Sequence, residues 1–310
     1  MRQLRILFYK FLINMGWTFL LAVLFQIIKL YATPEGRIRK CVMAKVSIIM
    51  GIYNCADTLD AALDSLLSQT FTDWDIVMCD DGSNDATYEV ASQYCTAYPT
   101  KMTLLKNPQN MGLNYTLNRC LSIADGEYIA RQDGDDISMP TRFEKEVAIL
   151  DTSPDIAIVS TAMTYFDESG IWGQNHPTEF PKRENFIAGT PFCHAPCMVR
   201  REAYQAVDGY TEDPHYLRVE DYDLWIKMYA AGFRGQNITE PLYAMRDDRN
   251  AYSRRKFKYR INEFRVHIKA ARLLHLSLKA YIYAFRPIAV GLMPEKLYRA
   301  LHKMRLEKTL

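Results

Sequence analysis

The segment IARQDGDDISMP, residues 129–140, places three aspartates within four positions directly after a short apolar run. Residues 128–130 predict the end of a buried strand, and Met139-Pro140, followed by apolar residues at helical spacing, predicts a helix that begins with proline. The acids therefore lie on a strand-to-helix turn. In open α/β sheets such turns lie at the carboxyl ends of the strands, where ligands bind.

Asp133, Asp135 and Asp136 repel one another unless a cation or a ring of donors offsets their charge. A solvated turn that only caps the next helix is the simpler alternative, but a cap needs one carboxylate. Mg²⁺ and Mn²⁺ prefer oxygen ligands and are often held by one or two carboxylates and substrate phosphates. The segment therefore favours a divalent-cation site.

Strands and helices alternate on both sides of this segment. Strands are expected at 45–53, 74–80, 102–106 and 128–132, and helices around Leu59–Leu67, over 85–97 and over 113–124. This alternation predicts an α/β fold with a doubly wound, mostly parallel sheet and helices on both faces. Beyond residue 155, IAIVST, MTYF and HAPCMVRR read as strands, and EDYDLWIKMYAAG reads as a helix ended by Gly232.

The seven cysteines are scattered and odd in number, which favours a reducing compartment over a disulfide framework. Cys193, His194 and Cys197 fall together in FCHAPC. A zinc site is one interpretation, although two sulfurs and one imidazole are an incomplete set. Ordinary packed thiols are the other.

The charge is unevenly distributed, although the net charge is only +2. Residues 1–45 carry +7, residues 46–248 carry −18 and residues 249–310 carry +13. Basic arms bind nucleic acid or an anionic membrane surface. The apolar residues beside them favour a membrane surface, and we expect no nucleic-acid partner.

The stretch 11–31 is almost wholly apolar and about long enough to span a bilayer. Basic residues on both sides give no orientation, so a span and a monotopic or re-entrant anchor remain alternatives. A natural start at Met43, directly before the first core strand, is a third.

In the basic tail, Phe257, Ile261, Phe264, Ile268 and Ala271 trace one helical stripe, with basic residues beside it. Two interpretations stand. The helix lies on a membrane or a partner, or it packs on the preceding domain with its basic face exposed.

Three strand ends are expected to open toward one crevice. They offer the aromatic ring of Tyr53, the carboxylates of Asp80 and Asp81, and the acidic cluster that begins at Asp133. Neither G-x-x-x-x-G-K-[ST] nor G-x-G-x-x-G occurs, which disfavours a P-loop kinase and a dehydrogenase. The pattern favours a nucleoside diphosphate bridged through a metal ion.

A second acidic pair, Glu220 and Asp221, lies at the start of a predicted helix. Either carboxylate is a candidate general base for an acceptor hydroxyl. A charge pair that merely complements the helix dipole is the alternative.

Taken together, the motifs VSIIMGIYN, DIVMCDDGSNDAT, NMGLNYTLN, GEYIARQDGDDISMPTR and EDYDLW closely resemble those of the inverting GT-A glycosyltransferases of family 2. They occur in the family's order over roughly residues 45–253. The resemblance implies a GT-A fold, a nucleotide-sugar donor and Mn²⁺ or Mg²⁺ as cofactor.

The resemblance also assigns roles by position. Tyr53 matches the aromatic residue that stacks on the base, and Asp81 matches the carboxylate that holds uracil in UDP-using relatives. Asp133 and Asp135 match the D-x-D motif, with Asp135 at the metal-ligand position. Asp221 matches the catalytic base.

GTPFCHAPCMVR and FRPIAVGLMP resemble the branch that makes bacterial exopolysaccharide or biofilm matrix, which places His194 near the acceptor or in a structural hydrogen bond. Two departures matter. Asp248 stands where members often carry a histidine, and the Q-x-x-R-W motif of processive synthases is missing. We therefore expect transfer of a single sugar.

These observations predict three regions: a hydrophobic anchor helix and basic linker at 1–44, a GT-A catalytic domain at 45–250 and a basic helical tail at 251–310. The expected function is inverting, metal-dependent transfer from a nucleotide sugar, a UDP-sugar by analogy, to a lipid-linked or polysaccharide acceptor. The expected location is the cytoplasmic face of the inner membrane. A polyprenyl-phosphate glycosyltransferase and an interaction protein acting through its basic arms are the alternatives.

Overall fold

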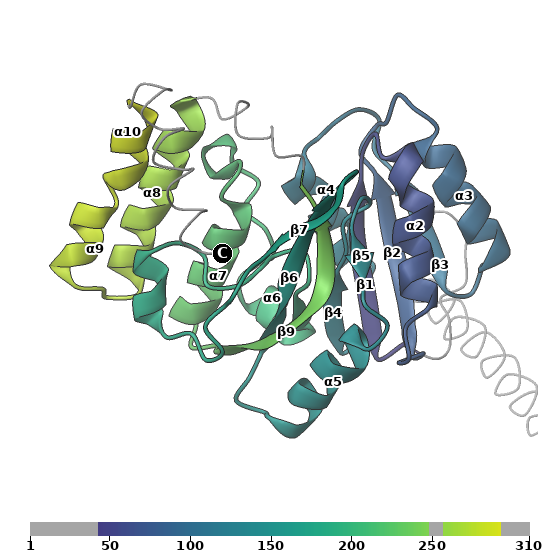
Figure 1. Ribbon diagram of the computed structural model, residues 1–310, viewed down its shortest axis with the longest axis horizontal. Helices are drawn as coiled ribbons and strands as arrows, with labels where there is room; N and C mark the ends of the chain where they lie inside the picture. Colours follow the sequence, from purple (N-terminus) through teal and green to yellow (C-terminus); the bar gives the residue numbers. More distant parts are fainter. Residues whose placement is uncertain (1–42, 248–256, 293–310) are drawn as a thin grey trace, which may run out of the picture. The chain divides into compact units, whose positions relative to one another are not determined.

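A nine-stranded β-sheet runs through the molecule (Figure 1). The structure, a computed structural model, describes residues 43–247 and 257–292. The expected anchor at 11–31 and Asp248 lie outside the described residues. Within the described part of the chain, no helix is both long enough and apolar enough to cross a bilayer.

The strand order is β3-β2-β1-β4-β8-β6-β9-β5, and β7 pairs with β6. The strands are β1 (Val46–Ile52), β2 (Trp74–Asp80), β3 (Met102–Lys106), β4 (Tyr128–Arg131), β5 (Ile137–Ser138), β6 (Ile158–Asp167), β7 (Gly170–Gln174), β8 (Met198–Arg200) and β9 (Gly235–Arg246). β3, β2, β1 and β4 are parallel neighbours, as the alternation predicts. Beyond β4 the sheet is mixed, because β8 runs antiparallel to both β4 and β6, while β6 and β9 are parallel.

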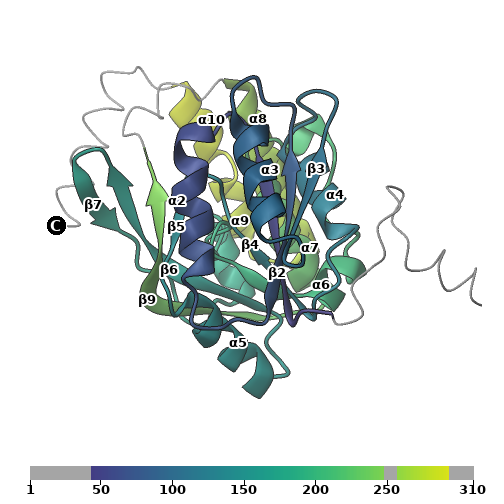
Figure 2. The same ribbon diagram turned by 90° about the vertical axis from the view of Figure 1, so that its right-hand side faces the viewer.

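Helices cover both faces of this sheet, as Figures 1 and 2 show. They are α2 (Ala56–Leu67), α3 (Thr87–Ala97), α4 (Leu113–Leu121), α5 (Arg142–Thr152), α6 (Arg201–Ala206), α7 (Glu220–Ala230), α8 (Phe257–Leu273), α9 (Leu278–Tyr283) and α10 (Arg286–Gly291), with short 3₁₀ helices η1 (Arg183–Ile187) and η2 (Pro214–Tyr216). The doubly wound α/β architecture is therefore confirmed.

Strand β1 shows why its sequence is almost wholly apolar, with Ser47 as the one polar residue. Successive side chains of a strand point to opposite faces, so a strand that is covered on both sides needs apolar residues at every position. Ile48 and Met50 enter a core with α2, α3 and α5, while Ile49 enters a second core with α4, α6, α7 and α8. The carboxyl ends of β1, β2 and β4 are thus held from both faces.

One strand prediction needs correction. IAIVST and MTYF were expected to form two strands, but together they contribute to the single strand β6, which runs alongside β9. The single residue between the two apolar runs, Ala162, continues the strand because β9 accommodates it, with register shifts on either side of Ala162. A bulge that keeps the strand continuous leaves no turn signal in the sequence.

The basic helix α8 packs on α7 through residues that lie outside the predicted apolar stripe. Val266 and Ala270 of α8 are fully buried in the second core. Asn262 donates to the carbonyl oxygens of Pro214 (3.2 Å) and Leu217 (3.1 Å). Within the predicted stripe, Ala271 is buried and Phe264 contacts the ring of Phe285, whereas Phe257 is 46% exposed, so protein covers the stripe only in part.

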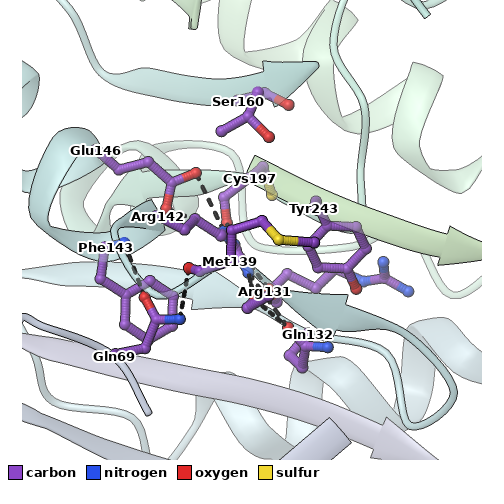
Figure 3. A network of polar contacts seen from close by, with 12 residues as sticks. Gln69, Arg131, Gln132, Met139, Arg142, Phe143, Glu146, Ser160, Cys197 and Tyr243 are labelled. Carbon is purple, nitrogen blue, oxygen red and sulfur yellow. Dashed lines mark hydrogen bonds and ion pairs between the residues drawn. The ribbon is translucent and has the colours of Figure 1, made fainter. Parts of the chain in front are cut away.

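A buried polar network lies beneath the acidic turn (Figure 3). The fully buried guanidinium of Arg142 donates to Ser138 Oγ (2.8 Å) and to the carbonyl oxygen of Arg131 (2.9 Å), and it pairs with Glu146 at 3.2 Å. Burial raises the pKa of Glu146 to about 8, against the effect of Arg142. Since Arg is rarely buried without partners, this residue is a structural anchor.

Gln132 extends the network into the turn itself. Its side-chain amide donates to the carbonyl oxygens of Asp133 (3.1 Å) and Asp136 (2.9 Å), and its oxygen accepts from Ser138 Oγ (2.7 Å). The backbone of the acidic turn is therefore fixed from below, which leaves its carboxylates to face the crevice or each other.

Substituting Arg142 by Met should lower the free energy of unfolding by about 3–5 kcal/mol, because it removes the donors of several buried acceptors and the partner of Glu146. Lys145→Met, one turn away, is the matched control. Its ion pair with Glu240 is largely exposed, so the expected loss is below about 1 kcal/mol. Urea unfolding of both variants measures the difference, and equal losses would contradict this role for Arg142.

Candidate active site

The loops that follow β1, β2 and β4 are joined by hydrogen bonds. The amide of Asn54 donates to Ser83 Oγ (3.0 Å), and the amide of Asn84 donates to Asn54 Oδ1 (2.9 Å). The hydroxyl of Thr58 donates to the carbonyl oxygen of Gly134 (2.9 Å). The three predicted strand ends therefore meet at one edge of the sheet.

Two glycines allow these loops to approach closely. Gly82 has φ +72°, and a Cβ there would lie 2.6 Å from the backbone of Gln109. A Cβ on Gly134 would lie 2.7 Å from Cys55 Sγ. Such distances are shorter than carbon atoms tolerate, so any larger residue would push the strand-end loops apart.

The expected nucleotide-binding residues differ in how available they are. The ring of Tyr53 is 43% exposed and free to stack on a base. Asp80 is fully buried. Its Oδ1 accepts from the amide of Ser83 (3.3 Å), while its Oδ2 meets no donor among the described residues.

Asp81 is engaged on both oxygens. Oδ1 accepts from Asn107 Nδ2 (2.6 Å) and from the amide of Met111 (2.8 Å), and Oδ2 accepts from the amide of Gly112 (2.9 Å). In this structure Asp81 therefore holds the loop 107–112 against the strand end. Oδ2 accepts only one of these bonds, so a base contact by Asp81 would add a second hydrogen bond to that oxygen.

The three aspartates of the acidic turn have three different environments. Asp133 accepts two hydrogen bonds from Arg131, at 3.0 and 2.6 Å. Asp136 is buried, and its Oδ1 accepts from the amide of Arg246 (2.7 Å). Burial, then the charges of Asp133 and Asp135, raise the pKa of Asp136 to about 8. The repulsion is thus reduced by one ion pair and by partial protonation.

Asp135 is the carboxylate that remains open. It is exposed, and within the described residues it accepts no hydrogen bond from another side chain. Loss of hydration where the protein packs against the carboxylate, and then the neighbouring charge of Asp133, raise the pKa of Asp135. A bound cation would stabilise the ionised form of a carboxylate that lies beside another negative charge.

Asp221 comes from the first turn of α7, and Arg131 is near enough to act on its charge. Burial and then the charge of Glu220 raise the pKa of Asp221 to about 6, while the nearby guanidinium of Arg131 lowers it. Since Arg131 also pairs with Asp133, the structure brings together two acidic groups that lie far apart along the chain. Beside them, Glu220 Oε2 is buried without a partner among the described residues.

His194 lies near the same guanidinium but has a structural partner. Its Nε2 is 2.8 Å from the hydroxyl of Tyr210, and its ring contacts Trp225 edge-on. Burial, and then the charge of Arg131, lower its pKa well below the usual value, so the ring is neutral near pH 7.

The zinc interpretation of FCHAPC is not supported by these contacts. Cys193 Sγ accepts from Asn175, and Cys197 is fully buried. Over residues 43–247 and 257–292, no three His, Cys, Asp or Glu side chains converge on a point that would hold a metal ion by themselves. This holds for the acidic turn as well, so an ion bound there would need further ligands from a substrate or from water.

The sequence matches a known protein family. The model described as Glycosyl transferase family 2 matches residues 47–208, which contain all three strand-end motifs. The chain belongs to glycosyl transferase family 2. It is therefore an enzyme that transfers a sugar.

Relatives match this family 2 chain over most of its length. EpsE of Bacillus subtilis (strain 168), which carries the name of a glycosyltransferase, is 43% identical over 84% of the chain and 94% of EpsE. The amylovoran biosynthesis glycosyltransferase AmsE of Erwinia amylovora is 26% identical over 83% of the chain and 97% of AmsE. The UDP-Glc:alpha-D-GlcNAc-diphosphoundecaprenol beta-1,3-glucosyltransferase WfaP of Escherichia coli is 28% identical over 72% and 86%.

Solved structures of low identity share the fold. S. aureus TarS residues 1–349 in complex with UDP-GlcNAc has a TM-score of 0.64 and 16% identity, over 81% of this chain and 77% of the other. The mannosyltransferase PcManGT from Pyrobaculum calidifontis, in complex with GDP-Man and Mn²⁺, has a TM-score of 0.57 and 18% identity, over 87% and 82%. The expected GT-A fold is confirmed.

Three contributors to the site were not anticipated: Arg131, which pairs with Asp133; Asn107, which holds Asp81; and Tyr243, whose hydroxyl accepts from the amide of Asp133 (3.2 Å). Arg131 carried a signal, because a basic residue at the end of an apolar strand needs a partner. The other two come from distant segments and carry none.

Substituting Asp135 by Asn should leave the free energy of unfolding unchanged or raise it slightly. The substitution breaks no hydrogen bond to another described side chain and removes one charge from a repelling cluster. Thermal unfolding in a chelator-containing buffer measures this. A loss greater than about 1 kcal/mol would show that Asp135 has a structural role.

Proposed function

We propose that the chain catalyses inverting, metal-dependent transfer of one sugar from a UDP-sugar to a lipid-linked or polysaccharide acceptor in bacterial exopolysaccharide synthesis. The observation that carries the proposal is the position of Arg131, which pairs with Asp133 and lies close enough to Asp221 to lower its pKa. This supports a single site that combines the D-x-D turn with a carboxylate of suitable basicity. This is the arrangement that transfer with a single displacement requires.

The donor end of the site would take the nucleoside between Tyr53 and the end of β2. The exposed Tyr53 ring offers a stacking face, and the unpartnered Oδ2 of Asp80 offers an acceptor for a base or ribose donor. UDP is supported by WfaP, whose name states UDP-Glc, and by the TarS complex with UDP-GlcNAc.

Asp135 would be the direct ligand of Mn²⁺ or Mg²⁺, and Asp133 would assist from its pair with Arg131. The residues fit such an ion, since Asp135 presents an exposed carboxylate whose pKa its surroundings raise. The remaining ligands would be diphosphate oxygens and water, as is usual for these ions. When bound, the metal would offset the charge that develops on the leaving diphosphate.

Asp221 would act as the general base. A pKa of about 6 leaves the carboxylate ionised near pH 7 but basic enough to accept a proton. It would take the proton of an acceptor hydroxyl as that oxygen attacks the anomeric carbon from the side opposite the diphosphate. One displacement of this kind inverts the anomeric configuration.

The acceptor assignment rests on the relatives and on the surroundings of Asp221. WfaP acts, by its name, on a sugar diphosphoundecaprenol, and AmsE on amylovoran biosynthesis. Glu220 precedes the predicted base in the chain, and His194 is held by Tyr210; both would face the acceptor side. A lipid-linked acceptor would place the enzyme at the cytoplasmic face of the inner membrane.

Substituting Asp221 by Asn should reduce transfer from the UDP-sugar by about 10²- to 10⁴-fold, since the amide cannot accept the proton. Binding of UDP with Mn²⁺, read as a rise in melting temperature, should be retained, because the residue is not assigned to the donor. The matched variant Glu220→Gln should retain most of the transfer rate at pH 8. Wild-type activity in Asp221→Asn would contradict the mechanism.

The pH dependence of kcat/KM should report the carboxylate of Asp221. Activity should fall about tenfold per pH unit below about pH 6, because protonation removes the base. The charge of Glu220 contributes to the raised pKa of Asp221, so Glu220→Gln should move this acidic limb to lower pH. A limb that stays in place, or moves upward, would argue that another group titrates.

A further inference from the structure

An exposed row of large apolar side chains runs along α9 and α10. Its members are Leu278 (76% exposed), Tyr281 (36%), Ile282 (69%), Phe285 (58%) and Leu292 (71%). Their spacing of three, four, seven and fourteen residues from the first member places them on one side of a helix. The link between α9 and α10 keeps this alignment, because Ala284 and Phe285 both have right-handed helical backbone angles.

The opposite side of the same segment is packed. Ala280 and Ala284 are buried, and Phe264 of α8 contacts the Phe285 ring at 5.0 Å. Figure 1 shows α8, α9 and α10 lying together at one end of the molecule, with α7 between them and the sheet. The exposed row is therefore held rigidly by a helix that is itself anchored in the core.

Two exposed cations lie beside this row. Residues 257–292 contain seven Lys or Arg, of which Arg260 pairs with Glu263 (3.0 Å) and Lys269 pairs with Asp223 (2.5 Å). Lys279 and Arg286 follow directly after Leu278 and Phe285 and are exposed. The surface thus combines apolar side chains with unneutralised positive charge.

We propose that the outward face of α9 and α10 is a docking surface for an anionic lipid bilayer. The apolar row would enter the boundary between headgroups and acyl chains, while Lys279 and Arg286 contact lipid phosphates. Helices of this composition lie in the interface plane, and each nearby Lys or Arg strengthens attachment to anionic lipid.

The charge pattern favours a lipid surface over a protein partner. The buried centres of protein interfaces are depleted in charged residues, whereas basic residues beside apolar ones are typical of surface-bound amphipathic helices. The rings of Tyr281 and Phe285 suit the headgroup level, where aromatic side chains gather. Helix α8 is less suited to this role, because Val266 and Ala270 pack in the core and Phe264 contacts Phe285.

This inference rests on the proposed function in one respect, since docking brings the site to a lipid-linked acceptor. It is nevertheless measured without donor or acceptor. Failure of docking and failure of transfer are therefore separate results.

Hydrogen–deuterium exchange of the full chain tests the proposal, because it reads α9 directly even if other segments also hold the chain on vesicles. Vesicles of phosphatidylcholine with phosphatidylglycerol should slow exchange of the amides of 278–292, because anionic lipid attracts the nearby Lys and Arg. Phosphatidylcholine vesicles should slow it much less, and added salt should reverse the protection.

Ile282→Asp should abolish the vesicle-dependent protection of 278–292 without changing transfer to a soluble acceptor. Ile171→Asp is the matched control, since Ile171 is 70% exposed on β7, and it should retain the protection. Equal exchange with and without anionic vesicles would overturn the proposal. So would protection that appears without lipid as protein concentration rises, because a second copy would then cover the face.

Discussion

The ion pair between Arg131 and Asp133 is the interaction on which the site depends. Three aspartates at the end of a buried strand would repel one another, and Arg131 neutralises part of that charge through two hydrogen bonds. The guanidinium is nearly fully buried, so its field is weakly screened and reaches Asp221 and His194 as well. One cation thereby acts on both predicted groups: it pairs with Asp133, and it partly opposes the burial and the charge of Glu220 that raise the pKa of Asp221.

The parallel half of the fold was predictable from the sequence because burial on two faces leaves a continuous apolar run, as in β1, and because each run is followed by a helical pattern. The mixed half was not. β8 is short and antiparallel, and its place between β4 and β6 depends on pairing between distant segments. The bulged course of β6 is likewise fixed by β9, which the sequence of β6 alone does not reveal.

The sequence predicted which residues form the candidate site, but it did not predict which partners they contact. Carboxylates at strand ends signal a cation site because like charges in proximity require compensation. The assignment of which carboxylate is free depends on tertiary partners: Asp81 is occupied by the loop 107–112, Asp133 by Arg131, and Asp135 remains open. The same limit applies to the tail, where a helical stripe cannot show whether protein or lipid covers it. Packing assigned α8 to the core and left the apolar row of α9 and α10 exposed.

A crystal structure with an intact UDP-sugar analogue and Mn²⁺ tests the central claim most directly, because anomalous scattering locates the metal independently of the protein density. The account predicts an anomalous peak between the Asp135 carboxylate and the diphosphate, with the Asp221 carboxylate on the opposite side of the anomeric carbon. A diphosphate bound elsewhere, or a metal peak away from Asp135, would contradict it.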